Sequence, residues 1–283
     1  MKREENLDFI SKIIDKSGKE ISEAVLVFLS AVKYISKEGD VFAKLEETDS
    51  FQEYIEDNSG LIMKLSIEKS VQGNIPERGL PILEILSRKI GNTLINVIEL
   101  GASYGLIGRC LLDPINIIKN KDRYFPARQK IPENIRAINK YLGIELNPPD
   151  KDWLLAGIWE EDIELRLRNF INDIQPGNEF ELTQGNAFGF TTSEPVKKLV
   201  SQPGTVIVLT SFMLYQYSEK KRKILKDNIL EFTKRLDGHW INQAVNVATQ
   251  SQIDDYYIAW DDKKIIELND DTCMNWRWLS ESD

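Results

Sequence analysis

The chain has 283 residues, of which 42% are hydrophobic and 29% are charged, and these values indicate one large globular domain or a core domain with an appended piece. Its formal net charge of −9 disfavours a broad electrostatic grip on nucleic acid or on an anionic membrane. With a single histidine, and two cysteines outside any metal-ligand spacing, we expect no metal site.

The N-terminus carries charges of both signs and has no apolar signal-peptide core. The longest apolar stretch, residues 206–214, is too short to span a bilayer. We therefore expect a soluble, cytoplasmic protein with no membrane contact, and the sequence leaves its oligomeric state open.

Residues 7–90 have the pattern of amphipathic helices. Between residues 22 and 35 apolar side chains recur with the period of an α-helix, and residues 61–67 and 80–90 repeat the pattern. We expect residues 1–90 to form a helical cap region that packs over the carboxyl ends of the following strands. The alternative is a helical layer that covers only an edge of the sheet.

Strand and helix patterns alternate from residue 95 onward. The expected strands cover residues 95–100, 141–146, 180–184, 204–210 and 239–245, and the expected helices cover residues 106–112, 150–173 and 219–236. Two further strands around a polar turn, at residues 256–260 and 265–268, predict an antiparallel hairpin. The order predicts an α/β fold with a Rossmann-like, mostly parallel sheet over residues 91–283 and a C-terminal antiparallel hairpin, with ligands at the carboxyl ends of the strands.

A glycine turn follows the first strand and carries the strongest local signal. The strand delivers Glu99, Gly101 allows a sharp turn, and Gly105 allows a ligand to approach the backbone closely. Because the turn opens a helix, we expect free amide groups to face the site. The same pattern also fits a strand-to-helix turn with no ligand.

A dinucleotide site fits the turn less well. The fingerprint G-x-G-x-x-G needs a second glycine where this chain has Ser103. It also needs an acidic residue about 20 residues further on, whereas Glu145 comes 44 residues after Gly101. A nicotinamide-dependent oxidoreductase is therefore disfavoured, and a hydrolase lacks both a G-x-S-x-G motif and a Ser-His-Asp set.

Two later strands end in polar residues that suit a nucleoside. Glu145 ends the second strand, where a carboxylate can accept hydrogen bonds from both ribose hydroxyls. Asn186 follows the third strand, where an amide can meet the adenine amino group. Taken alone, Glu145 is equally well an exposed strand-end residue, and Gly185-Asn186 a turn.

These segments together resemble an uncharacterised prokaryotic family, a domain of unknown function in the methyltransferase-like superfamily. The match includes the glycine turn at residues 97–107, Gly143-Ile-Glu-Leu-Asn-Pro, Asp152-Trp-Leu with its later Trp159, and Gln72-Gly-Asn with Arg78. It implies a class I fold that binds S-adenosylmethionine and acts as a transferase. The residues implied to hold this cofactor are Glu99, Gly101, Ala102, Ser103, Gly105, Glu145, Asn147, Asn186, Ala187 and Ser211.

The chain departs from the family pattern at two places. The fourth strand of the family ends in His-Ser, where this chain has Thr210-Ser211, and a C-terminal His-x-His is replaced around Cys273. If those histidines act in catalysis, their role is missing or reassigned here, so the catalytic residues stay unknown.

Several conspicuous residues have a structural interpretation. We expect His239 to be a strand-end residue, Trp276 and Trp278 to pack in the core on a final strand, and residues 220–223 to form a solvated basic helix face. Tyr215 and Tyr217 follow the fourth strand, where a methyl acceptor binds in methyltransferases, and packing at the sheet edge is the alternative.

The leading hypothesis is thus an S-adenosylmethionine-dependent methyltransferase with a small-molecule substrate and no nucleic acid partner. The alternative is a non-catalytic protein that binds S-adenosylmethionine or a nucleotide on the same fold. Methyl transfer mainly requires alignment and exclusion of water, so the shortage of histidines does not exclude catalysis.

Overall fold

The computed structural model describes residues 3–19, 21–36, 48–70, 75–133, 135–246, 255–269, 273 and 275–279. The chain divides into two compact units, residues 1–74 with 149–165, and residues 75–148 with 166–283. This division differs from the expected boundary at residue 90. The segment before the first strand belongs to the sheet unit because all of residues 79–86 are buried there.

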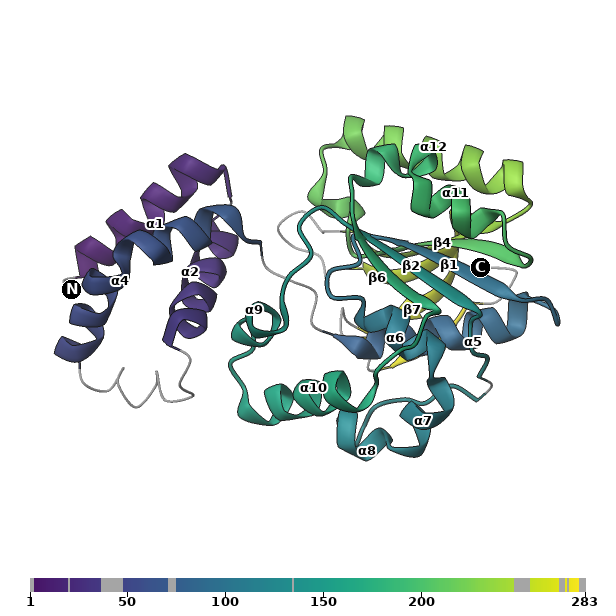
Figure 1. The fold of residues 1–283 in the computed structure, drawn as a ribbon, viewed down its shortest axis with the longest axis horizontal. Coiled ribbons are helices and arrows are strands. Elements are labelled where there is room, and N and C mark those ends of the chain that lie inside the picture. Colours follow the sequence, from purple (N-terminus) through teal and green to yellow (C-terminus); the bar gives the residue numbers. More distant parts are fainter. Residues whose placement is uncertain are drawn as a thin grey trace. The chain divides into compact units, whose positions relative to one another are not determined.

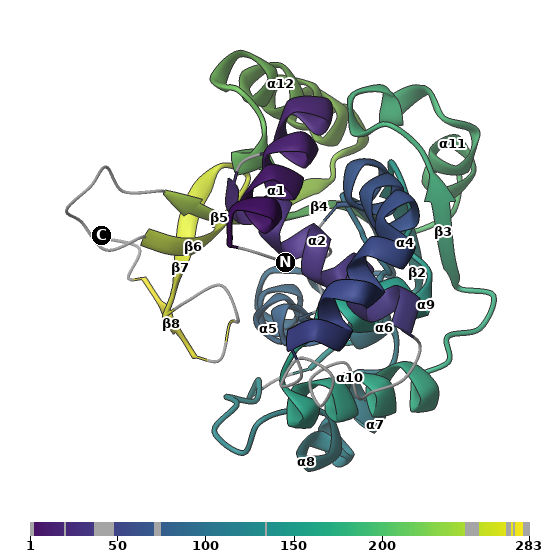
Figure 2. The same cartoon turned by 90° about the vertical axis from the view of Figure 1, so that its left-hand side faces the viewer.

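The first unit is helical, as expected. Its helices α1 (Arg3–Ser17), α2 (Ile21–Ser36) and α4 (Thr48–Glu68) lie side by side (Figures 1 and 2). The short helix α9 (Lys151–Ala156) completes their core with Trp153, whose indole nitrogen donates to the Ser70 carbonyl at 3.1 Å. A segment more than 80 residues away in sequence therefore closes this helical core.

The second unit contains an eight-stranded sheet in the order β3-β2-β1-β4-β5-β6-β7-β8. Its first five strands in this order run parallel, and β6, β7 and β8 are antiparallel. The strands are β1 (Ile95–Leu100), β2 (Lys140–Glu145), β3 (Phe180–Gln184), β4 (Thr205–Ser211), β5 (His239–Asn246), β6 (Asp255–Trp260), β7 (Lys263–Leu268) and β8 (Trp276–Trp278). The mixed α/β class, the mostly parallel sheet and the C-terminal antiparallel strands are confirmed.

Helices cover both faces of the sheet (Figure 1). One face packs against α11 (Glu194–Val200) and α12 (Glu219–Leu236), and the other against α5 (Gly79–Lys89) and α6 (Leu106–Leu112). Double coverage explains why all six residues of β1 are buried. The remaining elements are α7 (Pro114–Lys119), α8 (Lys121–Tyr124), α10 (Glu161–Asp173), and the 3-10 helices η1 (Pro76–Arg78), η2 (Ala187–Thr192) and η3 (Leu214–Gln216).

The helix expected over residues 150–173 is wrong as one element. It is divided into α9 and α10, because α9 ends at Ala156 with Gly157 as its C-cap. The final strand is confirmed, and Trp276 is buried as expected. Glu84 on α5 accepts from the indole nitrogens of Trp276 at 2.9 Å and Trp278 at 2.8 Å, which attaches β8 to this helix.

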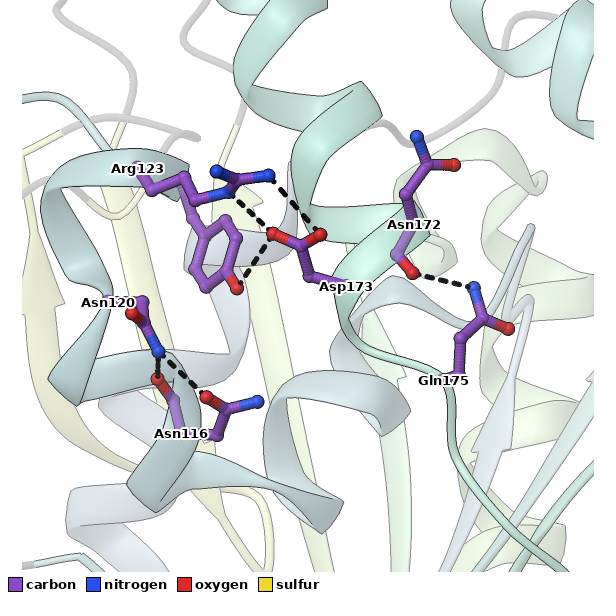
Figure 3. A network of polar contacts seen from close by, with 7 residues as sticks. Asn116, Asn120, Arg123, Asn172, Asp173 and Gln175 are labelled. Atoms are coloured by element: carbon purple, nitrogen blue, oxygen red, sulfur yellow. Dashed lines mark hydrogen bonds and ion pairs between the residues drawn. The ribbon is translucent and has the colours of Figure 1, made fainter.

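The long segment between α6 and β2 is anchored by a polar network (Figure 3). Asp173 at the end of α10 accepts from Arg123 Nε at 2.5 Å and from the Tyr124 hydroxyl at 3.2 Å. Asn120 Nδ2 donates within the same segment to the Asn116 side-chain oxygen at 2.7 Å. Because Arg123 is largely exposed, this ion pair contributes little stability by itself, and the network positions the segment.

Among the residues described, no helix has both the length and the apolar character needed to cross a membrane.

The closest packing between α6 and the sheet lies at Gly108, and it gives a stability prediction. A Cβ built on Gly108 overlaps the Tyr141 ring, whereas one built on Gly91 meets nothing within 4 Å. Overpacking costs about 1–3 kcal/mol, which exceeds the gain of about 1 kcal/mol from alanine in a helix. Gly108→Ala should therefore lower the free energy of unfolding in urea titrations, and Gly91→Ala should leave it nearly unchanged. Equal stability of the two variants would contradict this packing.

Candidate functional site

The turn after β1 requires the glycines that it contains. Gly101, Ser103 and Gly105 have positive φ angles of 72°, 51° and 72°, a region that strains other side chains. A Cβ on Gly101 would lie 2.7 Å from Met213 Sδ, and one on Gly105 would lie 2.6 Å from the Phe180 ring. The turn is therefore held tightly between Met213, which follows β4, and Phe180 of β3.

Four backbone amides of this turn bind protein acceptors. Gly101 and Ala102 donate to the Ile144 carbonyl at 2.9 Å and 3.3 Å, and Gly105 donates to the Ala102 carbonyl at 2.7 Å. Ser103 donates to the Glu145 carboxylate at 2.9 Å. The expectation that free amides of the turn face a ligand is wrong for these four groups, because the end of β2 lies close enough to accept three of their hydrogen bonds.

Glu145 joins the turn to the second strand. Its Oε2 accepts from the Ser103 amide at 2.9 Å and its Oε1 accepts from the amide of the exposed Asn147 at 3.4 Å. A carboxylate has about four acceptor positions, so these bonds leave capacity for two further donors. The structure thus brings Glu145 and the glycine turn together at one edge of the sheet.

Asn186 lies beyond the end of β3 and caps η2. Its side-chain oxygen accepts from the Phe188 amide at 2.9 Å, and this bond fixes which end of the amide group carries the oxygen. The neighbouring Ala187 is buried. Phe188 packs edge-on against Tyr217, with ring centroids 5.2 Å apart. Desolvation, and then the charge of Glu145, raise the pKa of Tyr217, so these side chains gather near the end of β2.

Glu99 is a buried acid rather than an exposed charge. It is 2% exposed and accepts from the Tyr141 hydroxyl at 2.5 Å. Gly143 lies opposite Glu99 in the register, and its missing side chain makes room for this hydroxyl. Desolvation raises the pKa of Glu99 to about 8, although the Tyr141 bond and the charge of Arg78 act in the opposite direction. At neutral pH its carboxyl is mostly protonated.

The ends of β4 and β5 carry a second polar cluster. Ser211 Oγ donates to Gln243 Oε1 at 2.6 Å, and Gln243 Nε2 donates to the Arg78 carbonyl at 2.7 Å. The Arg78 guanidinium lies 4.3 Å above the Phe212 ring centroid. Ser211 thus lies among protein partners near η1.

Thr210, where the resemblance implies a histidine, faces the opposite side of the sheet from Ser211. Its hydroxyl donates to Asn242 Oδ1 at 2.9 Å and accepts from the Trp240 indole at 3.0 Å. All three side chains are buried. Thr210 therefore belongs to the core under α12. Asn74, the third residue of the Gln72-Gly-Asn resemblance, lies outside the described residues.

His239 lies at the opposite end of the strands, as expected. The strand register pairs it with Ile207, whereas Gln243 pairs with Ser211, and four strand residues correspond to about 13 Å. Its Nδ1 lies 2.8 Å from Asp261 Oδ2, and its ring packs on Trp260. The prediction of a strand-end histidine is confirmed.

Three side chains of the site were missed by sequence reasoning. Tyr141, Phe212 and Gln243 fall within or beside strands, and nothing in their local pattern distinguishes them from packing residues. The pairing register brings Gln243 opposite Ser211, and side-chain packing brings Tyr141 to Glu99 and Phe212 to Arg78. Among the described residues, no group of three side chains could hold a metal ion.

No protein-family model and no curated protein match the chain. Among solved structures, the chain is similar to a protein from Thermobifida fusca YX that is called a putative methyltransferase. The TM-score is 0.32 at 7% sequence identity, and the match covers 62% of this chain and 54% of the other. The matched region thus spans about half the length of that protein.

The burial of Glu99 predicts a pH-dependent stability. Its pKa is near 4.5 when exposed and about 8 in the fold, so the unfolded chain loses this proton first. The free energy of unfolding should fall as the pH rises through this window, by about 3–5 kcal/mol in total. Glu99→Gln keeps an acceptor for Tyr141 and should remove this part of the slope.

The matched control is Glu181→Gln, because Glu181 is exposed on β3. Urea titrations between pH 5 and 8 should give the control the slope of the unmodified protein. An identical slope for Glu99→Gln would show that Glu99 is ionised in the folded state.

Proposed function

We propose that the protein is an S-adenosylmethionine-dependent methyltransferase acting on a small molecule. The observation that carries the proposal is the hydrogen bond from the Ser103 amide to Glu145 at 2.9 Å. It joins the glycine turn after β1 to the acid at the end of β2. Both lie beside the point where the strand order reverses between β1 and β4, the usual position of nucleotide sites in such sheets.

Different residues at this edge of the sheet would contact different portions of the proposed cofactor. Glu145 retains acceptor capacity for the two ribose hydroxyls, and the turn formed by Gly101, Ala102, Ser103 and Gly105 would adjoin the amino-acid portion. Asn186 and Ala187 would adjoin the adenine. Since the Asn186 oxygen already caps η2, its amide nitrogen is the end suited to donate to a ring nitrogen.

Glu99 and Ser211 have indirect roles in this proposal. A protonated Glu99 would stabilise the turn indirectly, because it holds the hydroxyl of Tyr141, whose ring packs beside the turn. It would supply no full charge to a ligand. Ser211 orients Gln243. Bound S-adenosylmethionine would supply an activated methyl group, and the chain would align the acceptor and exclude water. Asn147 would contribute through the main-chain bond that holds Glu145.

A specific observation favours a second candidate, a protein that binds the cofactor without turnover. Thr210, at the position of the family's histidine, is buried in hydrogen bonds to Trp240 and Asn242. A group so placed cannot reach an acceptor. The net charge of −9 favours a small-molecule ligand over nucleic acid. A cytoplasmic location remains part of the proposal. A helical cap over the strand ends stays a prediction.

The cofactor proposal is tested by calorimetry with S-adenosylhomocysteine. We expect binding and a raised melting temperature, and we expect Glu145→Gln to weaken binding by roughly 1–3 kcal/mol, or about 5- to 150-fold. Glu181→Gln on the neighbouring strand is the control and should bind normally. A stabilising effect of NAD with none from S-adenosylhomocysteine would sink the proposal.

Catalysis, if it occurs, should not depend on His239. Because His239 lies at the amino end of β5 beside Asp261, His239→Ala should keep the methylation rate within about threefold, less than 1 kcal/mol of barrier. Single-turnover kinetics with the acceptor, once found, measure this rate. A loss of about a hundredfold with intact cofactor affinity would identify His239 as the base.

A further inference from the structure

Tyr217 lies close to a carboxylate to which it is not bonded. Desolvation, and then the charge of Glu145, raise the pKa of Tyr217, so the phenol lies near this carboxylate. Its main chain is fixed, because its amide donates to the Leu214 carbonyl at 3.2 Å and its carbonyl accepts from Arg222 at 3.3 Å. Within the described part of the chain, however, no hydrogen bond joins the Tyr217 hydroxyl to Glu145 or to any other group.

Two other tyrosines beside a carboxyl group bond it directly. The hydroxyl of Tyr124 donates to Asp173 at 3.2 Å, and that of Tyr141 donates to Glu99 at 2.5 Å. In both cases desolvation and then the neighbouring carboxylate raise the pKa of the tyrosine, as they do for Tyr217. A phenol and a carboxylate that are close but not bonded to each other are placed to bind one further group together.

The contact between Tyr217 and Phe188 places the phenol at the strand ends. In the sheet order β2 and β1 separate β3 from β4, and three strand spacings amount to about 14 Å. The two ring centroids are nevertheless 5.2 Å apart, so the connections after β3 and β4 lean toward each other. Both rings pack on the core beneath α11 and α12, whereas the glycine turn opens α6 on the opposite face. A ligand along the ends of β1 and β2 would therefore lie between the turn and this aromatic pair.

The chemistry of Glu145 and Tyr217 decides which ligand group suits both. Glu145 accepts from two main-chain amides and can accept from two further donors. The phenol stays neutral because its pKa is raised, and it has one proton to donate. A group bonded to both must donate to the carboxylate and accept from the phenol. An alcohol does this with one oxygen, whereas an ammonium only donates, and an ionised phosphate or carboxylate is repelled by Glu145.

We propose that Tyr217 determines ligand specificity by binding, together with Glu145, one ribose hydroxyl of the nucleoside. The Tyr217 hydroxyl donates to the ribose oxygen, and the ribose hydroxyl donates to Glu145. This inference rests on the methyltransferase function proposed above, and it assigns Tyr217 to the cofactor rather than to the methyl acceptor. A nucleoside that lacks this hydroxyl, or carries a phosphate on it, is rejected because both protein groups lose their partner.

The test combines a change in the ligand with a change in the protein. Calorimetry on the full chain compares S-adenosylhomocysteine with its 2′-deoxy and 3′-deoxy forms, and adenosine with its own two deoxy forms. We expect one deoxy form in each series to bind about tenfold or more weakly. Tyr217→Phe should weaken S-adenosylhomocysteine by about two- to tenfold and leave that deoxy form nearly unchanged. The ratio of the two affinities therefore falls, whereas a change in packing alone would weaken both ligands equally.

Tyr124→Phe is the matched control. Tyr124 also lies beside a carboxylate, but it bonds Asp173 in the segment between α6 and β2, so this variant should give the ratio of the unmodified protein. Tyr217→Phe keeps the ring and removes a hydroxyl that has no partner among the described residues, so melting curves should show it folded. Glu145→Gln should lower the same ratio, because it acts on the same ribose hydroxyl. An unchanged ratio in Tyr217→Phe, or equal binding of all three ligands in a series, would overturn the inference.

The two probe series separate this inference from the proposed function. If S-adenosylhomocysteine binds and Tyr217→Phe leaves the ratio unchanged, the cofactor proposal stands and the ribose contact of Tyr217 is wrong. If adenosine binds and its deoxy forms are rejected through Tyr217, but S-adenosylhomocysteine does not bind, the methyltransferase function fails and the ribose contact stands. Binding of neither ligand would overturn both.

Discussion

The packing of the Tyr141 ring determines the geometry of the candidate site. A Cβ on Gly108 would overlap this ring, one on Gly143 would lie 3.1 Å from its hydroxyl, and one on Gly105 would lie 3.7 Å from its edge. Three missing side chains therefore let one aromatic ring fill the space between α6, the glycine turn and β2. The ring also stacks on Phe180 of β3, with centroids 5.1 Å apart. The helix α6, the glycine turn and strands β2 and β3 thus all pack against this one aromatic ring.

The same ring decides the electrostatics of the site. Its hydroxyl reaches Glu99 and satisfies a carboxyl that is otherwise buried on the central strand. Without this partner a buried acid would be costly. Desolvation raises the pKa of Glu99 to about 8, although the Tyr141 bond acts to lower it. Charged groups at the strand ends include Glu145 on the β2 side and Arg78 on the β4 side.

The candidate site combines segments that lie far apart in the sequence. Glu145 meets the glycine turn because parallel strands end at the same edge of the sheet. Arg78 precedes all the strands, yet the buried Gln243 of β5 holds its carbonyl. The buried amide of Gln243 has partners on both of its polar atoms, which gives one preferred arrangement. The Arg78 guanidinium stacks on the Phe212 ring.

Local pattern was sufficient to predict most of the fold. Apolar periodicity located the strands to within a residue or two, and the glycine turn and the strand-end position of Glu145 were readable, because these depend on neighbours along the chain. Tertiary structure alone decided which unit holds residues 149–165, that Asn186 turns its oxygen to η2, and that Thr210 faces the core. It also decided that the Tyr141 hydroxyl donates to Glu99 and that the Arg78 guanidinium stacks on Phe212. The reason is that strand register and helix packing set these contacts, and both depend on residues distant in sequence.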